Sequence, residues 1–210
     1  MEYTYGFNYI LFAYMKGGYD LVNESLLSPP ASAEQLANPI LAGIDEPVDV
    51  PLDVINEEFE AQGCDLVQTN VLNIIDLRWM LMLGREKEWR LDARSAERAS
   101  DGWSGGAFTF GRCGGEPFIF SETRWDSRRE AREFYNGLET VFAARFGDKK
   151  KDGRWKDDDL SIRVLESDSS VYFWMIPESL DENALKSELE RLQPAEILIP
   201  DSARLPAALA

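Results

Sequence analysis

The sequence predicts an α+β fold, in which a helical N-terminal half packs with a four-stranded antiparallel sheet. Three observations support this prediction. Helical periodicity dominates the first hundred residues, strand pairs around tight turns recur at 95–125 and 160–177, and an amphipathic helical segment follows each pair. Two such strand-strand-helix units build one sheet with both helices on one face. We expect residues 1–210 to form a single unit, with a mainly helical half at 1–100 and an α+β half at 101–210.

The stretch Ser95–Trp125 is the most informative part of the chain. Several glycines surround Trp103, which suits tight backbone turns and close packing against an indole. Ala107–Phe110 is a short β-prone run, Cys113–Gly115 is a turn, and Phe118–Trp125 alternates apolar and polar side chains. The pattern predicts a β-hairpin with aromatic side chains, onto which the rest of the sheet is built.

The N-terminal residues have the spacing of a helix with one buried face. We assign that face to apolar side chains that recur at three and four residues, namely Phe7, Ile10, Leu11, Tyr14 and Met15. Gly17-Gly18 interrupts the pattern, so we predict two helices at 5–16 and 19–27. Ser32 is expected to cap a short helical turn at 33–37.

Three further segments complete the helical half. Residues 43–51 are acidic and contain two prolines, which predicts an extended connection, and Leu52–Gln62 fits either a short strand or a helix. Gln68–Leu83 is apolar almost all round and predicts a central buried helix. Glu86–Ser100 mixes Arg and Glu at helical spacing, which predicts one continuous amphipathic helix.

The second half follows the hairpin with a helix, two strands and a last helix. We predict first a helix at Ser127–Phe146, capped by Asp126 or Ser127, and then a charged loop at 148–159. Two strands follow at 160–166 and 170–177. The last elements are a helix to about Leu192, capped by Ser179 or Asp181, and a short strand at Ile197–Ile199.

The charge balance is strongly acidic, with 38 Asp and Glu against 22 Lys and Arg and a net charge of -16. This balance argues against nucleic-acid binding, which needs clusters of Lys and Arg, and against anionic membrane surfaces. The basic residues are 15 Arg and only 7 Lys. Adaptation to high salt and an ordinary acidic surface both fit this composition, and the two interpretations stay open.

The chain contains no histidine and two cysteines. The absence of histidine excludes a Ser-His-Asp triad, a Cys-His dyad and every zinc site that uses His. Cys64 and Cys113 are too few for a four-thiolate zinc site. They fit one disulfide if the protein is exported, or buried thiols if it is not. We therefore predict no catalytic residue, no bound metal and no cofactor.

No apolar run is long enough to span a bilayer, so we expect no membrane insertion by this chain. Residues 1–19 are aromatic but have neither a basic leader nor a cleavage site for a signal peptide. The start at MEYTYG fits a cytosolic protein or an excised part of a longer one.

Two pairs of residues invite a functional interpretation. Trp103 and Trp125 fit an aromatic ligand platform, but we favour core residues that anchor the hairpin. Glu122 and Asp126 fit the paired acids of a glycosidase, but no spacing supports this and surface charge is the preferred interpretation.

The charged loop offers two more candidates. Asp152 with Asp157-Asp158-Asp159 fits a calcium site, but the run lacks the spacing of an EF-hand loop, so we favour a solvated loop. Lys149-Lys150-Lys151 is a basic island in an acidic chain, and we expect it to be solvated.

Residues 17–39 contain a recognisable pattern of glycine, proline and polar positions. It consists of Gly17, Gly18, Tyr19, Val22, Asn23, Pro29, Pro30, Ser32, Glu34, Gln35, Leu36 and Pro39. In these positions the chain resembles a family of predicted zinc metallopeptidase-like proteins, which occur as exported or surface proteins in bacteria and halophilic archaea. The resemblance covers about residues 6–145 and continues at Asp45-Glu46-Pro47, Val71–Leu83, Ala99–Gly106, Thr123–Asp126, and then Ala131, Glu133 and Phe134.

The chain also departs from this family pattern. Asn73-Ile74 replaces a Gly-Glu, Asn38 replaces a His, and Ser104-Gly105-Gly106 lacks the Asp of the family's Gly-Trp-Gly-Gly-Asp. The family's His-Glu-x-x-His motif, which supplies zinc ligands and a base, would lie before residue 1. No zinc-ligand role is therefore carried over to any residue of this chain.

The resemblance implies a non-catalytic binding or scaffolding module related to the C-terminal part of such surface proteins. A hydrolase that uses only Asp and Glu, and a cytosolic protein-interaction domain, are the alternatives. The partner is an unknown protein or small ligand. We expect an extracellular or cell-surface location if the chain belongs to a longer exported protein, and a cytoplasmic one otherwise.

Overall fold

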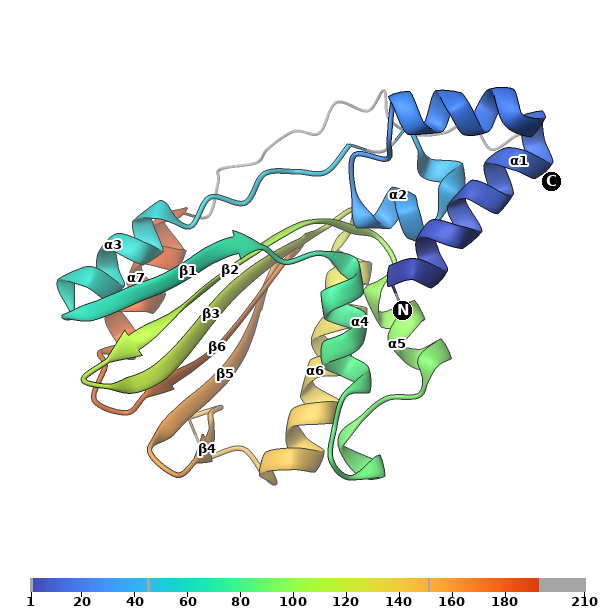
Figure 1. The fold of residues 1–210 in the computed structure, drawn as a ribbon. Helices are drawn as coiled ribbons and strands as arrows, with labels where there is room; N and C mark the ends of the chain where they lie inside the picture. The colour runs from blue at the N-terminus through green and yellow to red at the C-terminus, as the bar shows by residue number, and fades with distance from the viewer. Residues whose placement is uncertain (1, 45, 151, 193–210) are drawn as a thin grey trace.

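A computed structural model describes residues 2–44, 46–150 and 152–192 and has an α+β architecture (Figure 1). The helices are α1 (Glu2–Leu27), α2 (Ala33–Ala37), α3 (Asp53–Ala61), α4 (Ile74–Met82), α5 (Ala93–Ser100), α6 (Arg128–Phe146) and α7 (Glu182–Leu192), with short 3-10 helices η1 (Pro39–Leu41) and η2 (Lys87–Trp89). The strands are β1 (Cys64–Val71), β2 (Trp103–Cys113), β3 (Glu116–Trp125), β4 (Trp155–Asp157), β5 (Leu160–Ser167) and β6 (Ser170–Pro177).

The sheet has six strands in the order β1-β2-β3-β6-β5-β4, and every neighbouring pair is antiparallel. The predicted four strands correspond to β2, β3, β5 and β6. The prediction missed β4, inside the charged loop, and β1, which the first hundred residues contribute. The division into a helical half and an α+β half therefore does not follow the sheet.

Strand β1 was missed because its last residues were assigned to the following helix. That helix begins only at Ile74, where Asn73 forms a reciprocal cap with Asp76. The Asn73 Oδ1 accepts hydrogen bonds from the backbone N–H groups of Ile75 and Asp76, and Asp76 Oδ2 accepts one from Asn73 N–H. Because this cap fixes the helix start, the residues before it are extended and pair with β2.

Helices α6 and α7 lie on opposite faces of the sheet, which corrects the prediction that they share one face (Figure 1). Strand β6 explains why. Val171 and Phe173 pack in the core that contains α6, whereas Tyr172 and Trp174 pack in the core that contains α7. A strand that is apolar on both faces needs cover on both, since successive side chains point to opposite sides.

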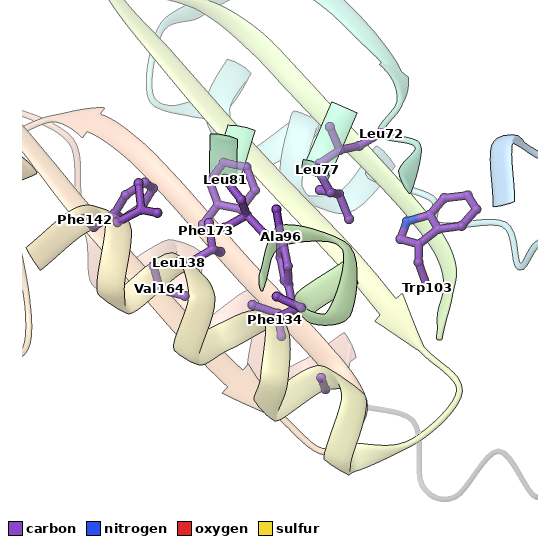
Figure 2. Close-up of a cluster of buried hydrophobic side chains, with 14 of the residues drawn as sticks. Leu72, Leu77, Leu81, Ala96, Trp103, Phe134, Leu138, Phe142, Val164 and Phe173 are labelled. Carbon is purple, nitrogen blue, oxygen red and sulfur yellow. The ribbon is translucent and has the colours of Figure 1, made fainter. Parts of the chain in front are cut away.

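The core beneath α4, α5 and α6 is the larger of the two. Figure 2 shows Leu77 and Leu81 of α4, Phe134 and Leu138 of α6, and Phe173 of β6 pointing toward one another. The second core lies between the other face and helices α3 and α7. Its main side chains are Ile55, Phe59, Phe118, Phe120, Trp174, Leu185 and Leu189.

The predicted hairpin is confirmed: β2 and β3 pair from Cys113 opposite Glu116 to Trp103 opposite Trp125, with a β-bulge between Trp103 and Gly105. Two glycines of β2 allow neighbouring backbone segments to approach the strand closely. A Cβ atom at Gly105 would collide with the carbonyl oxygen of Val48, and one at Gly106 with that of Leu72. Residues 46–50 thus cross directly over this end of the sheet, where Val48 N–H donates to Ser104 O at 2.7 Å.

Several predicted boundaries are confirmed. Gly17 and Gly18 have non-helical angles and divide α1 into two limbs, Ser32 caps α2, and Ser127 caps α6 by accepting from Glu130 N–H. Residues 52–62 contain a helix, α3. The strand expected at 197–199 lies outside the described residues.

The helix predicted for 86–100 is divided instead into η2 and α5. Asp92 causes the division, because its side chain accepts from Arg94 N–H and Ser95 N–H and so starts a new helix.

A disulfide joins Cys64, the first residue of β1, to Cys113, the last residue of β2. The two cysteines face each other in the ladder, and both are buried. The bond closes a loop with a sequence separation of 49 residues. Of the two states that the sequence allows for these cysteines, a disulfide and buried thiols, the structure has the disulfide.

Candidate functional site

The first limb of α1 has an apolar side chain on both of its faces. Its inner face packs on the protein through Tyr9 and Ala13, which are buried, and Tyr5, which is partly buried. Its outer face is exposed and is formed by Tyr3, Phe7, Leu11, Tyr14 and Met15, continued by Tyr19 of the second limb. We call these six residues the outer face of α1.

This arrangement corrects the predicted buried face. Phe7 is 66% exposed and Met15 is 78% exposed, whereas the spacing placed both in the core. Residues 5, 9 and 13 repeat with the same helical period as 3, 7 and 11, so periodicity indicates two apolar stripes without deciding which is covered. A helix that is apolar on both sides is normally buried on both sides.

The outer face is continuous across the kink in α1. The rings of Tyr14 and Tyr19 meet edge to face, with centroids 5.2 Å apart. Large exposed apolar patches are uncommon on monomeric proteins and mark interaction sites. Figure 1 shows the start of α1 beside α4 and α5 and the rest of α1 extending away from the sheet.

A buried arginine fixes α1 to the rest of the molecule. Arg78 of α4 donates from Nη1 to the Tyr5 hydroxyl at 3.1 Å and from Nε to Ser100 Oγ at 2.8 Å. Its guanidinium also lies 5.8 Å from the centre of the Tyr5 ring. One side chain therefore connects α1, α4 and the end of α5, and holds the inner face in place.

A hollow of about 350 Å³ lies beside the second limb of α1. Its wall combines Tyr9, Leu21 and Pro30 with the acids Glu24 and Glu46. The volume falls within the range of small-molecule sites. Its two carboxylates would favour a cationic group over an anionic one.

The two candidate tryptophans are core residues, as predicted. Trp103 and Trp125 are each 2% exposed, so neither offers a face to a ligand. The Trp125 ring packs on Phe134 with centroids 4.7 Å apart, and its Nε1 donates to Thr123 Oγ1 at 3.0 Å.

The two candidate acids at the end of β3 have different surroundings. Glu122 is buried and accepts a hydrogen bond from Arg124 Nε at 2.9 Å, so it is not the surface charge that we predicted. Asp126 donates its backbone N–H to Gly102 O at 2.9 Å. The contacts of Glu122 are those of a structural ion pair and do not require a substrate.

Burial is the main influence on the pKa of Glu122. It raises the pKa of the Glu122 carboxyl above its ordinary value of 4.5, and the charge of Arg124 offsets part of that effect. The neighbouring Tyr172 lies opposite Glu122 in the β3–β6 ladder. Its own burial, and secondarily the charge of Glu122, raise the pKa of Tyr172 to about 12.

The acidic run in the charged loop is divided between a strand and a turn. Asp157 ends β4, and Asp158 has a positive φ of 50° in the turn to β5. Asp152 is paired with Arg154, whose hydrogen bond lowers the pKa of the Asp152 carboxyl. Within residues 2–44, 46–150 and 152–192, no group of three or more Cys, Asp or Glu side chains could hold a metal ion.

The basic island is only partly solvated. Lys149 forms an ion pair with Glu139 and lies 4.5 Å from the centre of the Trp155 ring, so it is a packing residue and not the solvated charge that we expected. Lys150 is exposed, and Lys151 lies outside the described residues.

The molecule is an α+β domain from which α1 projects, with an exposed apolar face. We call α1 (Glu2–Leu27) the arm. A family model for a domain of unknown function, DUF8575, matches residues 66–186, which is more than half of the chain. The chain therefore belongs to the DUF8575 family. The match runs from β1 into α7, so α1 lies before it.

No curated protein and no solved structure matches this chain. Among the described helices, none combines the length and the apolar character needed to cross a membrane.

Proposed function

We propose that this chain is a non-catalytic binding module that uses the outer face of α1 to dock another folded protein surface. The observation that carries the proposal is that the first limb of α1 is apolar on both sides, while the part of the chain that the structure describes covers only one. Apolar side chains exposed in this way cost free energy in water, and an interface recovers it.

A protein surface is a better occupant than a lipid surface. Helices that lie on membranes carry many Lys and Arg on their polar face. Residues 2–27 contain one basic residue, Lys16, against Glu2, Asp20 and Glu24. The net charge of -16 further opposes binding to anionic lipids.

The proposed relation to metallopeptidase-like surface proteins is supported by the positions that carry the resemblance. Gly17 and Gly18 form the kink of α1, Ser32 caps α2, and Glu34 and Gln35 are buried there. These residues shape the arm and its support, as a scaffold shared within a family would require.

An extracellular or cell-surface location is part of the same proposal. The Cys64–Cys113 disulfide supports it, because such bonds persist in oxidising compartments and are rare in the cytosol. The hydrolase alternative finds less support, since Glu122 is held in an ion pair with Arg124.

Site-specific photo-crosslinking in cells that express the full chain tests the docking surface. A benzophenone amino acid replaces Phe7 in one variant and Val67 in the other. Val67 is the matched control because it is 61% exposed and apolar but lies on β1, away from α1. We expect a discrete protein product from position 7 and only background from position 67.

Equal labelling from both positions would contradict the proposal. So would co-sedimentation of the wild-type chain with neutral lipid vesicles that replacing Phe7 by Ser abolishes, because that result would assign the face to a membrane.

A further inference from the structure

We infer that the surface docked by the outer face of α1 is the outer face of α1 in a second copy of this chain. This inference rests on the proposed function and names its partner. The resulting dimer would be a twofold-symmetric, antiparallel packing of two α1 helices.

The area of the face is sufficient for a dimer. Four of its side chains pair in the arrangement described below, namely Tyr3, Phe7, Leu11 and Met15. Their exposed parts come to roughly 550 Å² on each partner, or about 1,100 Å² in total, taking about 150–250 Å² for a fully exposed large side chain. A specific interface needs about 1,000 Å² in total, so these four side chains alone reach that size.

The charge distribution favours a partner surface that is also uncharged. None of the six residues is an acid or a base, although the whole chain has a net charge of -16. A basic protein would be attracted to the acidic surfaces elsewhere, and it would gain nothing from this face. An identical face leaves no charge unpaired at the centre of the contact.

The spacing of four of the six residues is self-complementary. In an antiparallel pair centred between Phe7 and Leu11, Phe7 meets the partner's Leu11, and Tyr3 meets the partner's Met15, while Tyr14 and Tyr19 lie outside these contacts. Each contact occurs twice because a twofold interface is made by the same patch on both subunits. Rows of side chains four residues apart also form the ridges by which helices pack.

Sedimentation equilibrium of the full chain tests this inference directly. We expect a mass of twice 23.8 kDa at micromolar concentrations. Replacing Phe7 by Glu would place two charges near the twofold axis and weaken dimerisation by about a hundredfold. The matched control Val67→Glu, which adds the same charge on β1, would leave the dimer intact.

A rescue experiment keeps the test independent of folding. Phe7→Lys and Leu11→Glu chains should each be monomeric, and mixing them should restore a heterodimer, because position 7 faces position 11 of the partner. Circular dichroism of each variant alone checks that it is folded. Mixed chains that stay monomeric although each is folded would contradict the antiparallel pairing.

Salt separates the two possible kinds of protein partner. Dimerisation of two chains of charge -16 should tighten as salt screens their repulsion, whereas a complex with a basic protein would weaken. A chain that is monomeric at all salt concentrations, yet forms a product with a different protein from position 7, would overturn this inference and keep the proposed function. The absence of any product specific to position 7 would overturn both.

Discussion

The sheet and the α1 arm are both rich in apolar side chains, but the fold treats them differently. Strand β6 is apolar on both faces, and each face is covered, one by the core that includes α6 and the other by the core that includes α7. The first limb of α1 is also apolar on both faces, and residues 2–44, 46–150 and 152–192 cover only the inner one. A helix or strand that is apolar on both faces therefore points to a binding surface only where no other part of the fold covers one of those faces.

The two regions also differ in how they are fixed. The sheet is held by five antiparallel ladders, a disulfide and a buried ion pair between Arg163 of β5 and Glu182 of α7. The arm is fixed by the packing of Tyr9 and Ala13 and by the bond from Arg78 to Tyr5. Changes in the sheet should therefore affect the whole fold, and changes in the arm should affect the arm.

The largest effect should come from truncating an indole of the sheet. We expect Trp103→Ala to lower the free energy of unfolding by about 3–5 kcal/mol, because a buried aromatic leaves a large cavity. Phe7→Ser, its counterpart on the arm, should change that free energy by less than about 0.5 kcal/mol. Urea denaturation at high dilution, where association no longer adds stability, measures both. Equal losses in the two variants would show that the arm is part of the core.

Removing the disulfide should have the next largest effect. Replacing both Cys64 and Cys113 by Ala should cost about 4 kcal/mol, because the bond restricts a loop of about fifty residues in the unfolded chain. The same loss should follow when the wild type is denatured with excess reductant. A wild type whose stability does not depend on reductant would show that the bond does not form in solution.

The sequence predicted the elements whose signals are local. The hairpin was predictable from Gly114-Gly115 between alternating side chains, the kink from Gly17-Gly18, and the cap of α2 from Ser32. Strand β1 was not, because Gln68–Val71 runs directly into a helix and only pairing with β2 identifies it as extended. The positions of α6 and α7 on opposite faces of the sheet could not be predicted for a similar reason, since they depend on long-range packing.

The residues of the outer face of α1 could be predicted from the sequence, but their exposure could not. The apolar spacing of Phe7, Leu11 and Tyr14 was visible, but it was assigned to the core. Residues 5, 9 and 13 repeat with the same period, and only the position of α2 and α4 decides which stripe is covered. The ion pair of Glu122 was likewise beyond prediction, because the burial of Glu122 comes from long-range packing and not from the spacing of its neighbours in the sequence.

An intermediate effect should follow from releasing the arm. Arg78→Met keeps the apolar stem of the side chain but removes its hydrogen bonds to Tyr5 and Ser100. We expect a loss of about 2 kcal/mol, the scale of hydrogen bonds from a charged donor. Amide hydrogen exchange should accelerate in α1 and stay unchanged in β2 and β3. Uniform acceleration throughout the chain would contradict a local role for Arg78.

The smallest effect concerns Glu122, and its sign depends on pH. Burial raises the pKa of this carboxyl in the folded state, so the folded protein binds the proton more tightly than the unfolded chain does. The stabilising contribution of the protonated form is complete below the ordinary value of 4.5. It is lost as the pH rises through the higher pKa of the folded state. At neutral pH the folded protein therefore carries a buried charge that Arg124 only partly compensates.

Replacing Glu122 by Gln imitates the protonated carboxyl and should remove that cost. We expect the variant to be slightly more stable than the wild type at pH 7, and the difference to disappear as the pH falls below 4.5. Urea denaturation across this range measures the difference. Glu116→Gln, an exposed position on the same strand, is the control and should leave the pH dependence unchanged. If the Glu122→Gln variant were less stable at pH 7 and the gap closed in acid, the attraction of Arg124 would outweigh burial, and the sheet would gain stability from this ion pair.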